Sequence, residues 1–432
     1  MLPSFREAAV VHVYLKGLHK DGGVALRGYV FAESAVRPWQ GWGGGYLCQP
    51  HIPGTTWPDL FLQTLRGEKR VLRFRAHHEL MFGFNSDEPA PETSDKFRMC
   101  VPYPVTLTVS TADAAADFTL HVAGLADYAY FSPGSLHRPL RHQGPVGGDA
   151  RVQAVLYPFL EHTPQALVNN VLFLYVQYHL QLGYSRFYQY TQSIFVAGFL
   201  ADERLARLVQ AGSLVFILWE GTSWCSGPQH IKCWQPVIYS HAILVSWGMS
   251  NVYLTMADHD EYLALPNCAA VGSVQSLVKY CFGQRTAPRL WRYDVFCSTE
   301  SCRSPADEVA LWRANGAGGA HPMQHFTRRK SGPYKNEHGK SFVDPEHGGP
   351  FEVHSGLVLP GGHKIEGYLG DMVNPTCGVW LHVINMFVPR DRPDAEPTVL
   401  DARWQWALER LDAAEAIGSA ARRRGGRSAG NR

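Results

Sequence analysis

The stretch Asn251-Val252-Tyr253-Leu254-Thr255-Met256-Ala257-Asp258-His259-Asp260-Glu261-Tyr262-Leu263 decides the fold that we expect, because an apolar run leads directly into three acidic residues. A run of this kind is typical of a strand buried in a sheet. Ligands of open α/β sheets lie beyond the carboxyl ends of the strands, which is where Asp258 and Asp260 fall. Side chains two apart on an extended segment point the same way, so these two carboxylates can share one side.

The residues before this stretch alternate between predicted helices and predicted strands. Helical patterns cover residues 166–182, 202–210 and 235–247, and each is followed by a glycine that can end the helix. Apolar strand patterns cover residues 185–190 and 213–219. This rhythm predicts right-handed βαβ units and a buried parallel sheet, and therefore an α/β fold.

The sequence pattern is different before residue 150 and after residue 303. Residues 1–150 contain short β-prone runs cut by Gly and Pro, which favours an antiparallel β domain. Residues 303–350 are rich in Gly, Pro and His, and we expect long loops around a site there. Residues 401–416 have the pattern of an amphipathic helix, and a basic tail follows. We therefore expect a β-rich accessory domain at 1–150, a catalytic domain at 151–395, and a helix with a basic disordered tail at 396–432.

The composition narrows the function classes. The net charge is +2, from 40 basic and 38 acidic residues, which argues against a general nucleic-acid binder. None of the nine cysteines forms a CxxC pair, so a structural zinc site is not expected; Cys225–Cys233 and Cys297–Cys302 are the pairs closest in sequence. No run approaches the ~20 apolar residues of a membrane span. The N-terminus lacks the apolar core of a signal peptide, so the sequence, taken literally, predicts a soluble chain.

The acidic triplet indicates a metal site. Two neighbouring carboxylates repel each other unless a cation lies between them, and hard oxygen ligands suit Mn²⁺ or Mg²⁺. Such a metal typically serves a diphosphate, whose leaving charge it neutralises as a Lewis acid. The competing interpretation is an exposed acidic turn without a ligand.

Four stretches, in order and in register, resemble glycosyltransferase family 92. They are residues 174–179 with Gly183 and 187–190, residues 258–263 with Pro266, residues 339–345 with Val353-His354, and Leu381-His382. The resemblance runs from about residue 152 to 387, rather more than half of the chain. Three positions depart from the family pattern, and they bear on donor specificity more than on the fold: Leu174, Thr191 and Ile243.

The resemblance implies a GT-A-like catalytic domain, which is a Rossmann-type α/β domain with a mixed, mostly parallel sheet, beside the smaller β-rich N-terminal domain. It also implies an inverting transfer of a sugar, galactose from UDP-galactose, onto an oligosaccharide or polysaccharide. The reaction would need a divalent metal, Mn²⁺ or Mg²⁺. Family members are anchored in the Golgi by an N-terminal span, so the implied location is the Golgi lumen or membrane.

The resemblance also assigns roles to individual residues. Asp258 and Asp260 would hold the metal, and His354 would complete the site, because GT-A enzymes commonly use a later histidine. Asp258, Lys340 and Tyr190 would bind the donor, with Lys340 at the diphosphate. A lone lysine before a strand is also commonly just solvated.

An inverting transfer needs a general base for the acceptor hydroxyl. Glu261, Asp294 and Asp371 are the candidates, and spacing does not choose among them; we favour Asp294, which lies in the predicted strand 290–296. For His179, at the end of a helix, we favour a structural role. For His382, a structural role and a role in the site stay equally open.

Three other functions remain as alternatives. A catalytically inactive relative would bind glycans without turning them over, although both acids are retained. A metal-dependent hydrolase would activate water with similar residues, but a denser set of His and Asp ligands is expected for it. An extracellular interaction domain is supported only by the β-rich residues 1–150.

Overall fold

The structure is a computed structural model of the 432-residue chain. The residues that it describes are 8–20, 23–34, 60–64, 71–76, 103–122, 129–131, 150–219, 231–265, 272–283, 285, 287–297, 302, 304–314, 321–329, 339–346, 348–351, 356–358, 372–387, 389 and 398–399. The chain forms two compact units. The first contains Met1–Gly148, Glu220–Leu254 and Val343–Leu369, and the second contains Asp149–Trp219, Thr255–Phe342 and Gly370–Arg432.

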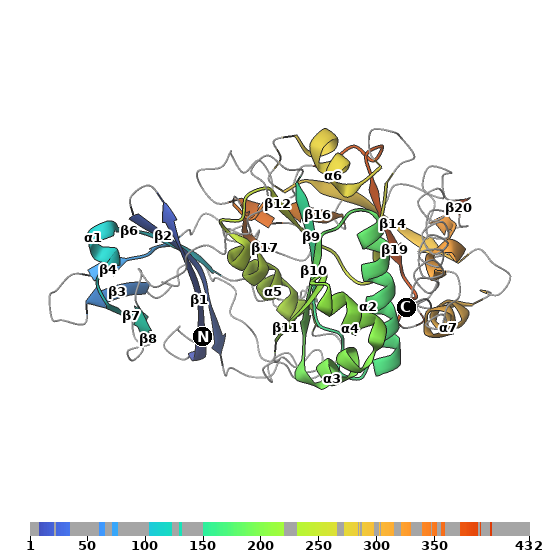
Figure 1. The fold of residues 1–432 in the computed structure, drawn as a ribbon, viewed down its shortest axis with the longest axis horizontal. Coiled ribbons are helices and arrows are strands. Elements are labelled where there is room, and N and C mark those ends of the chain that lie inside the picture. Colours follow the sequence, from blue (N-terminus) through green and yellow to red (C-terminus); the bar gives the residue numbers. More distant parts are fainter. Residues whose placement is uncertain are drawn as a thin grey trace, which may run out of the picture. The chain divides into compact units, whose positions relative to one another are not determined.

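The first unit is built on two four-stranded antiparallel sheets (Figure 1). In sheet order, the strands of one are β1 (Ala8–Lys20), β2 (Gly23–Ser34), β6 (Tyr103–Ser110) and β5 (Arg75–Ala76). Those of the other are β4 (Val71–Arg73), β3 (Leu60–Thr64), β7 (Phe118–Val122) and β8 (Ala129–Phe131). Apolar and polar side chains alternate along the strands, so that one face of each sheet is apolar. Both sheets contribute to one core, which includes Val24, Leu62, Val109 and Phe118.

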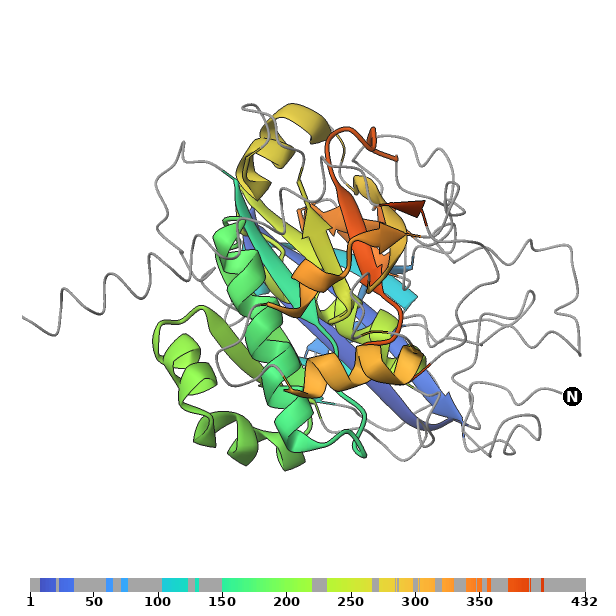
Figure 2. The same cartoon turned by 90° about the vertical axis from the view of Figure 1, so that its right-hand side faces the viewer.

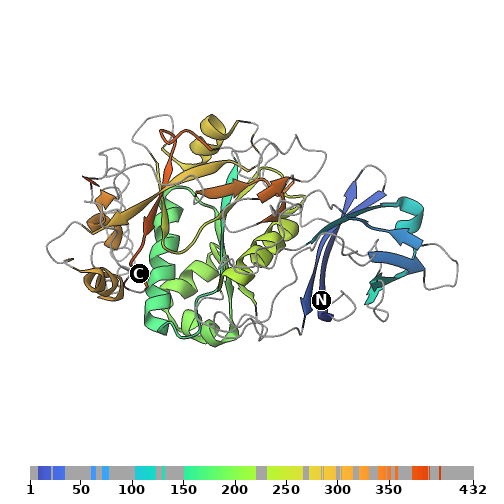
Figure 3. The ribbon, with the colours of Figure 1, turned by 180° about the vertical axis from the view of Figure 1, so that it is seen from behind.

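The other described elements of the first unit are helix α5 (Ile231–Ser246), the short helix α1 (Thr111–Ala114), and the hairpin of β17 (Gly348–Phe351) and β18 (Gly356–Val358). Figure 3 shows β1 and β2 from behind, as the long paired strands near the N-terminus. Lys16 on β1 donates to the carbonyls of Val245 and Trp247, at 2.5 and 2.6 Å. A lysine at this end of α5 satisfies carbonyls that the helix leaves open, so β1 and α5 are held together.

A ten-stranded sheet contains the strands of the second unit; two of its strands, Val252–Met256 and Lys340–Val343, include residues that fall in the first unit. Along the main path the strands are β11 (Leu214–Leu218), β10 (Arg186–Thr191), β9 (Arg151–Leu156), β12 (Val252–Met256), β16 (Lys340–Val343), β14 (Arg289–Phe296), β15 (Arg328–Arg329) and β20 (Thr398–Val399). Off this path, β19 (Val379–Val383) pairs with β14 in parallel and with β13 (Glu261–Ala264) in antiparallel orientation. Because β9, β10 and β11 pair in parallel while β14 and β16 pair antiparallel, the sheet is mixed.

Two helices of the second unit, α2 (Gln165–Gln181) and α4 (Glu203–Gln210), begin and end within one residue of the predicted bounds 166–182 and 202–210. Helix α2 is followed by Gly183 at φ +95°, and α4 by Gly212 at φ +70°. The Asp202 carboxylate accepts from the Arg204 backbone N–H at 3.0 Å and caps α4. Left-handed backbone at a glycine is a common way to end a helix, because glycine has no Cβ that would clash there.

Helices α2 and α7 (Pro305–Ala314) pack side by side, as Figure 2 also shows. Both pack against Tyr262 of β13: the Tyr178 ring of α2 lies 5.1 Å from the Tyr262 ring, and the Trp312 ring of α7 lies 5.7 Å from it. The remaining helical elements of this unit are α3 (Ser193–Ala201), α6 (Val274–Leu277), the π-helix η4 (Val278–Phe282) and the 3₁₀ helix η6 (Pro322–His325). Disulfides join Cys281 to Cys377 and Cys297 to Cys302.

The predicted α/β architecture is confirmed, and so is the antiparallel β structure of the described residues before 150. The expectation of long loops over 303–350 is wrong, because α7, η6, β15, β16 and part of β17 lie there. The predicted helix 401–416 lies outside the described residues. The expected domains 1–150, 151–395 and 396–432 stay a prediction. Within the described residues, no helix is both long enough and apolar enough to cross a membrane.

Candidate functional site

The acidic stretch forms a tight turn at the end of a buried strand. β12 ends at Met256, and β13 begins at Glu261. The Glu261 backbone N–H donates to the Asp258 carbonyl at 3.0 Å, which closes the turn. The Val383 N–H donates to the Asp260 carbonyl at 2.8 Å and ties the turn to β19. The backbone of the turn is therefore fixed on two sides.

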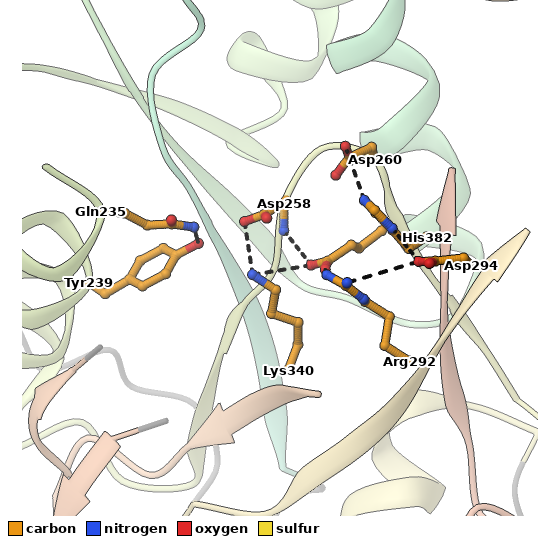
Figure 4. Close-up of polar contacts among 9 residues, drawn as sticks. Gln235, Tyr239, Asp258, Asp260, Arg292, Asp294, Lys340 and His382 are labelled. Atoms are coloured by element: carbon orange, nitrogen blue, oxygen red, sulfur yellow. Dashed lines mark hydrogen bonds and ion pairs between the residues drawn. The ribbon is translucent and has the colours of Figure 1, made fainter. Parts of the chain in front are cut away.

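Strand register brings three ionisable side chains into one row. Glu261 pairs with His382 across β13 and β19, and His382 pairs with Asp294 across β19 and β14. Residues directly opposite each other on neighbouring strands project to the same face. His382 Nδ1 lies 2.7 Å from Asp294 Oδ1, and His382 Nε2 lies 3.5 Å from Asp260 Oδ2 (Figure 4).

Two further cations complete the row. Arg292 precedes Asp294 by two residues on β14, so both project to one face. Its Nη1 lies 3.2 Å from Glu261 Oε1, and its Nη2 lies 3.9 Å from Asp294 Oδ1. Lys340, the first residue of β16, places Nζ 3.1 Å from Asp258 Oδ1 and 3.5 Å from Glu261 Oε2.

We call these seven side chains the charged cluster: Asp258, Asp260, Glu261, Arg292, Asp294, Lys340 and His382 (Figure 4). The side chains of Asp258 and Asp260 are 20% and 12% exposed, whereas those of Glu261 and Lys340 are 0% exposed. The side chains of Arg292 and His382 are 11% and 9% exposed, so Asp258 is the most exposed member of the cluster.

Burial and neighbouring charges set the protonation of the inner groups. Burial raises the pKa of Glu261 to about 7, although the Lys340 charge opposes this rise. Burial by itself lowers the pKa of His382, but the charge of Asp260 and the contacts with Asp260 and Asp294 outweigh it and raise this pKa to about 9. His382 is therefore a cation at neutral pH, held between two carboxylates.

The turn lies where the connections of the sheet change direction. β9 continues through α2 to β10 on one side, while β12 lies on the other side of β9. His259 stacks on Phe159 at 4.0 Å and meets Tyr157 edge-on at 5.6 Å, so the segments that follow β9 and β12 touch. Such a switch point is the usual ligand position of an open α/β sheet. The His259 ring packs against these aromatic rings, whereas the side chains on either side of it, Asp258 and Asp260, belong to the charged cluster.

The structure brings together most of the residues that the sequence singles out. Lys340, Glu261, Asp294 and His382 all lie in the charged cluster with the two aspartates, and a role for His382 in the site stays a prediction. Lys340 is not solvated, as an isolated lysine before a strand would be; it is completely buried.

Three candidates lie elsewhere or outside the described residues. Tyr190 is buried on β10, two strands away from β12, with its ring 5.5 Å from that of Trp219. His354 and Asp371 both lie outside the described residues. The roles of these three in donor binding, metal binding and catalysis stay predictions.

His179 has the structural role that the sequence favours. It is completely buried, and its Nε2 accepts from the Leu263 N–H at 3.3 Å. Nδ1 then carries the proton and donates to the Tyr175 carbonyl at 2.9 Å. Burial lowers the pKa of His179 to about 3, which keeps the ring neutral while it joins α2 to β13.

Sequence reasoning missed Arg292. Its only sequence signal is two charged residues, Arg292 and Asp294, at alternate positions of an otherwise apolar strand. Charges on one face of a buried strand need partners, so this pattern is a usable signal for a buried ionic site.

The residues present suit a hard divalent cation in part. The carboxylates of Asp258 and Asp260 are the ligand type that Mn²⁺ and Mg²⁺ prefer, and the Asp258 side chain is the most exposed of the cluster. Asp258 is also in contact with the Lys340 ammonium, which a bound metal would have to share or displace. Among the described residues, no group of three or more His, Cys, Asp or Glu side chains has the arrangement of a metal site.

No family model matches the chain, and no curated protein matches it.

Proposed function

We propose that this protein is a metal-dependent, inverting glycosyltransferase of the GT-A type that transfers galactose from UDP-galactose onto a glycan acceptor. The observation that carries the proposal is the position of Asp258 and Asp260: they follow a buried strand of an α/β sheet, at a switch point, and belong to a buried charged cluster in which Asp258 is the most exposed member. The donor and its sugar come from the resemblance to glycosyltransferase family 92.

In this proposal Asp258 and Asp260 hold the cation, Mn²⁺ or Mg²⁺. The bound metal would act as a Lewis acid that neutralises the leaving nucleoside diphosphate. His382 supports the assignment, because it places an imidazole 3.5 Å from Asp260 and would take the metal-ligand role that the resemblance assigns to His354. A histidine ligand must be neutral, so metal binding at His382 would release its proton.

Lys340 supplies fixed positive charge beside the diphosphate. Its ammonium lies directly behind Asp258 and is completely buried. Buried charges act over longer distances than solvated ones, because water does not screen them. Lys340 therefore favours an anion on the exposed side of Asp258 without having to reach the solvent.

Of the two described base candidates, Asp294 fits the reaction better. A general base must come within hydrogen-bond distance of the acceptor hydroxyl, directly or through one water. Glu261 is enclosed, and both of its carboxylate oxygens are engaged by neighbours. Asp294 lies in the strand beyond the metal motif and its side chain is 5% exposed, so it remains the base that we propose.

The proposed location is the Golgi lumen. Two disulfides in the second unit support a compartment that permits disulfide formation, because such bonds are rare in the cytosol. The remainder of this assignment rests on the resemblance to glycosyltransferase family 92.

The test is release of UDP from a panel of UDP-sugars with Mn²⁺, with and without a chelator. We expect release from UDP-galactose that the chelator abolishes and that Asp260→Asn lowers by at least about 100-fold, because the loss of a metal ligand removes the charge stabilisation of the leaving group. Asp202→Asn is the matched control, since the same substitution there keeps a helix cap.

Each other outcome counts against the proposal in a defined way. UDP release that survives both the chelator and Asp260→Asn would contradict the metal site. Tight binding of glycans without UDP release would instead favour a non-catalytic glycan-binding protein. Hydrolysis of a phosphodiester or glycoside substrate, with no donor turnover, would favour a metal-dependent hydrolase.

A further inference from the structure

Glu261 holds the Asp258 residue at both of its backbone groups. The Glu261 N–H donates to the Asp258 carbonyl at 3.0 Å, and the Asp258 N–H donates to Glu261 Oε2 at 2.9 Å. The two hydrogen bonds close the turn from opposite sides. The backbone at Asp258, from which its side chain projects, is therefore held in part by the Glu261 carboxylate.

The Glu261 carboxylate is itself held in place. Its other oxygen, Oε1, lies 3.2 Å from Arg292 Nη1, and Lys340 Nζ lies 3.5 Å from Oε2. The side chain is 0% exposed. A group enclosed in this way contacts neither donor nor acceptor, so any effect that it has on the reaction passes through the residues around it.

We propose that Glu261 is a positioning residue, which locks the Asp258–Asp260 turn in the shape that binds the divalent cation. This inference rests on the proposed function, because it assigns the cation to that turn. It replaces the role of general base that the sequence left open for Glu261. Partners that orient metal ligands in other proteins typically change metal affinity by about 10- to 100-fold when they are replaced.

The two roles predict different kinetics. Loss of a general base would lower kcat at every metal concentration and leave the binding of Mn²⁺ unchanged. Loss of a positioning residue would weaken the binding of Mn²⁺, and saturating Mn²⁺ would restore most of kcat. The affinity for the metal, measured without turnover, therefore separates the two.

The experiment measures the binding of Mn²⁺ alone by titration calorimetry, in the full chain, for Glu261→Asp and Glu261→Gln. The first substitution keeps the charge but shortens the side chain by one methylene, so it no longer reaches the Asp258 N–H. The second keeps the length but sets an amide NH₂ against Lys340 or Arg292. Glu308→Gln is the matched control, because Glu308 is also completely buried and also accepts from a backbone N–H, that of Cys297 at 3.3 Å.

We expect both Glu261 variants to bind Mn²⁺ at least about 10-fold more weakly than the wild type, with Glu308→Gln unchanged. Circular dichroism identifies any variant that fails to fold, and the less disruptive of the two then decides. Wild-type affinity in a folded Glu261 variant would overturn this inference and leave the proposed function standing. A wild-type chain that binds no Mn²⁺ at the turn would overturn both.

Discussion

Lys340 carries its charge where the side chain has no contact with solvent. Its ammonium lies between Asp258 and Glu261, at 3.1 and 3.5 Å. A buried ion pair of this kind is weak support for stability by itself, because the charges lose their hydration when they are enclosed. Removing one partner is different, since it leaves the remaining charges buried without compensation.

We therefore expect Lys340→Met to lower the free energy of unfolding by about 3–5 kcal/mol. Arg207→Met is the control: its ion pair with Glu203 joins side chains that are 63% and 88% exposed, and such a pair contributes about 0.3–0.5 kcal/mol. Urea unfolding of both variants measures the difference. Equal losses would show that Lys340 is not paired inside the protein.

The environment of His321 leads us to expect that acid lowers the stability of the protein. His321 Nδ1 accepts from the Met323 N–H at 3.2 Å, so the ring must be neutral there, and burial lowers its pKa from 6.5 to about 4. Between these two pH values His321 is mostly protonated in the unfolded chain and mostly neutral in the folded chain. The free energy of unfolding therefore falls as the pH drops below 6.5, by up to about 1.4 kcal/mol per pH unit for this group.

His321→Asn tests this expectation. Asparagine can still cap η6 at Met323, but it does not titrate. We expect the variant to lose less stability than the wild type between pH 7 and pH 5, as followed by urea unfolding at each pH. Parallel losses in the two proteins would mean that His321 is protonated in the folded state. The comparison uses the change in the free energy of unfolding per pH unit, because the two proteins differ in stability at neutral pH.

For individual residues, the sequence reveals which side chains carry charge and where the strand before Asp258 ends. It does not reveal which charged side chains contact one another. Asp258 and Asp260 stand out because an apolar strand precedes them. Arg292 and His382 do not, since Glu261 lies 31 residues from Arg292 and Asp294 lies 88 residues from His382 in the sequence. Only strand register brings them together.

At the scale of elements, the helix ends were the most predictable feature. Gly183, Gly212 and Gly248 all have positive φ, as expected of residues that follow helices. Helix α7 was missed, although Asp307 and Glu308 in its first turn are a usual start signal. The Gly- and His-rich residues on both sides of it dominated the composition of that region.

The disulfides connect elements, and their loop lengths predict different contributions. Cys281 and Cys377 are 96 residues apart, whereas Cys297 and Cys302 are 5 apart. A cross-link that closes a longer loop removes more conformational entropy from the unfolded chain. By this argument Cys377→Ser costs about 4–5 kcal/mol and Cys302→Ser about 2 kcal/mol.

Unfolding in urea without reductant, followed for each variant, measures the two costs. A larger loss in Cys302→Ser would mean that the short loop contributes through native contacts, and that loop length is the wrong guide here.

At the scale of the whole molecule, the alternation of helix and strand after residue 150 predicted the α/β architecture, because period and glycine position are local properties. The membership of the two units was not predictable in the same way. Residues 220–254 and 343–369 belong to the first unit. Residues 220–254 nevertheless continue the alternation of helix and strand patterns that precedes them in the sequence. Such assignments depend on contacts between distant segments, and composition does not contain them.

The central claim is that a divalent cation binds at the Asp258–Asp260 turn. Crystals soaked with Mn²⁺ and UDP, and measured for the anomalous signal of manganese, test it most directly. The account predicts one peak at the turn, with an oxygen of Asp260 and an oxygen of the diphosphate among its ligands. Bound UDP with no manganese at the turn, and with Asp258 still paired to Lys340, would contradict it.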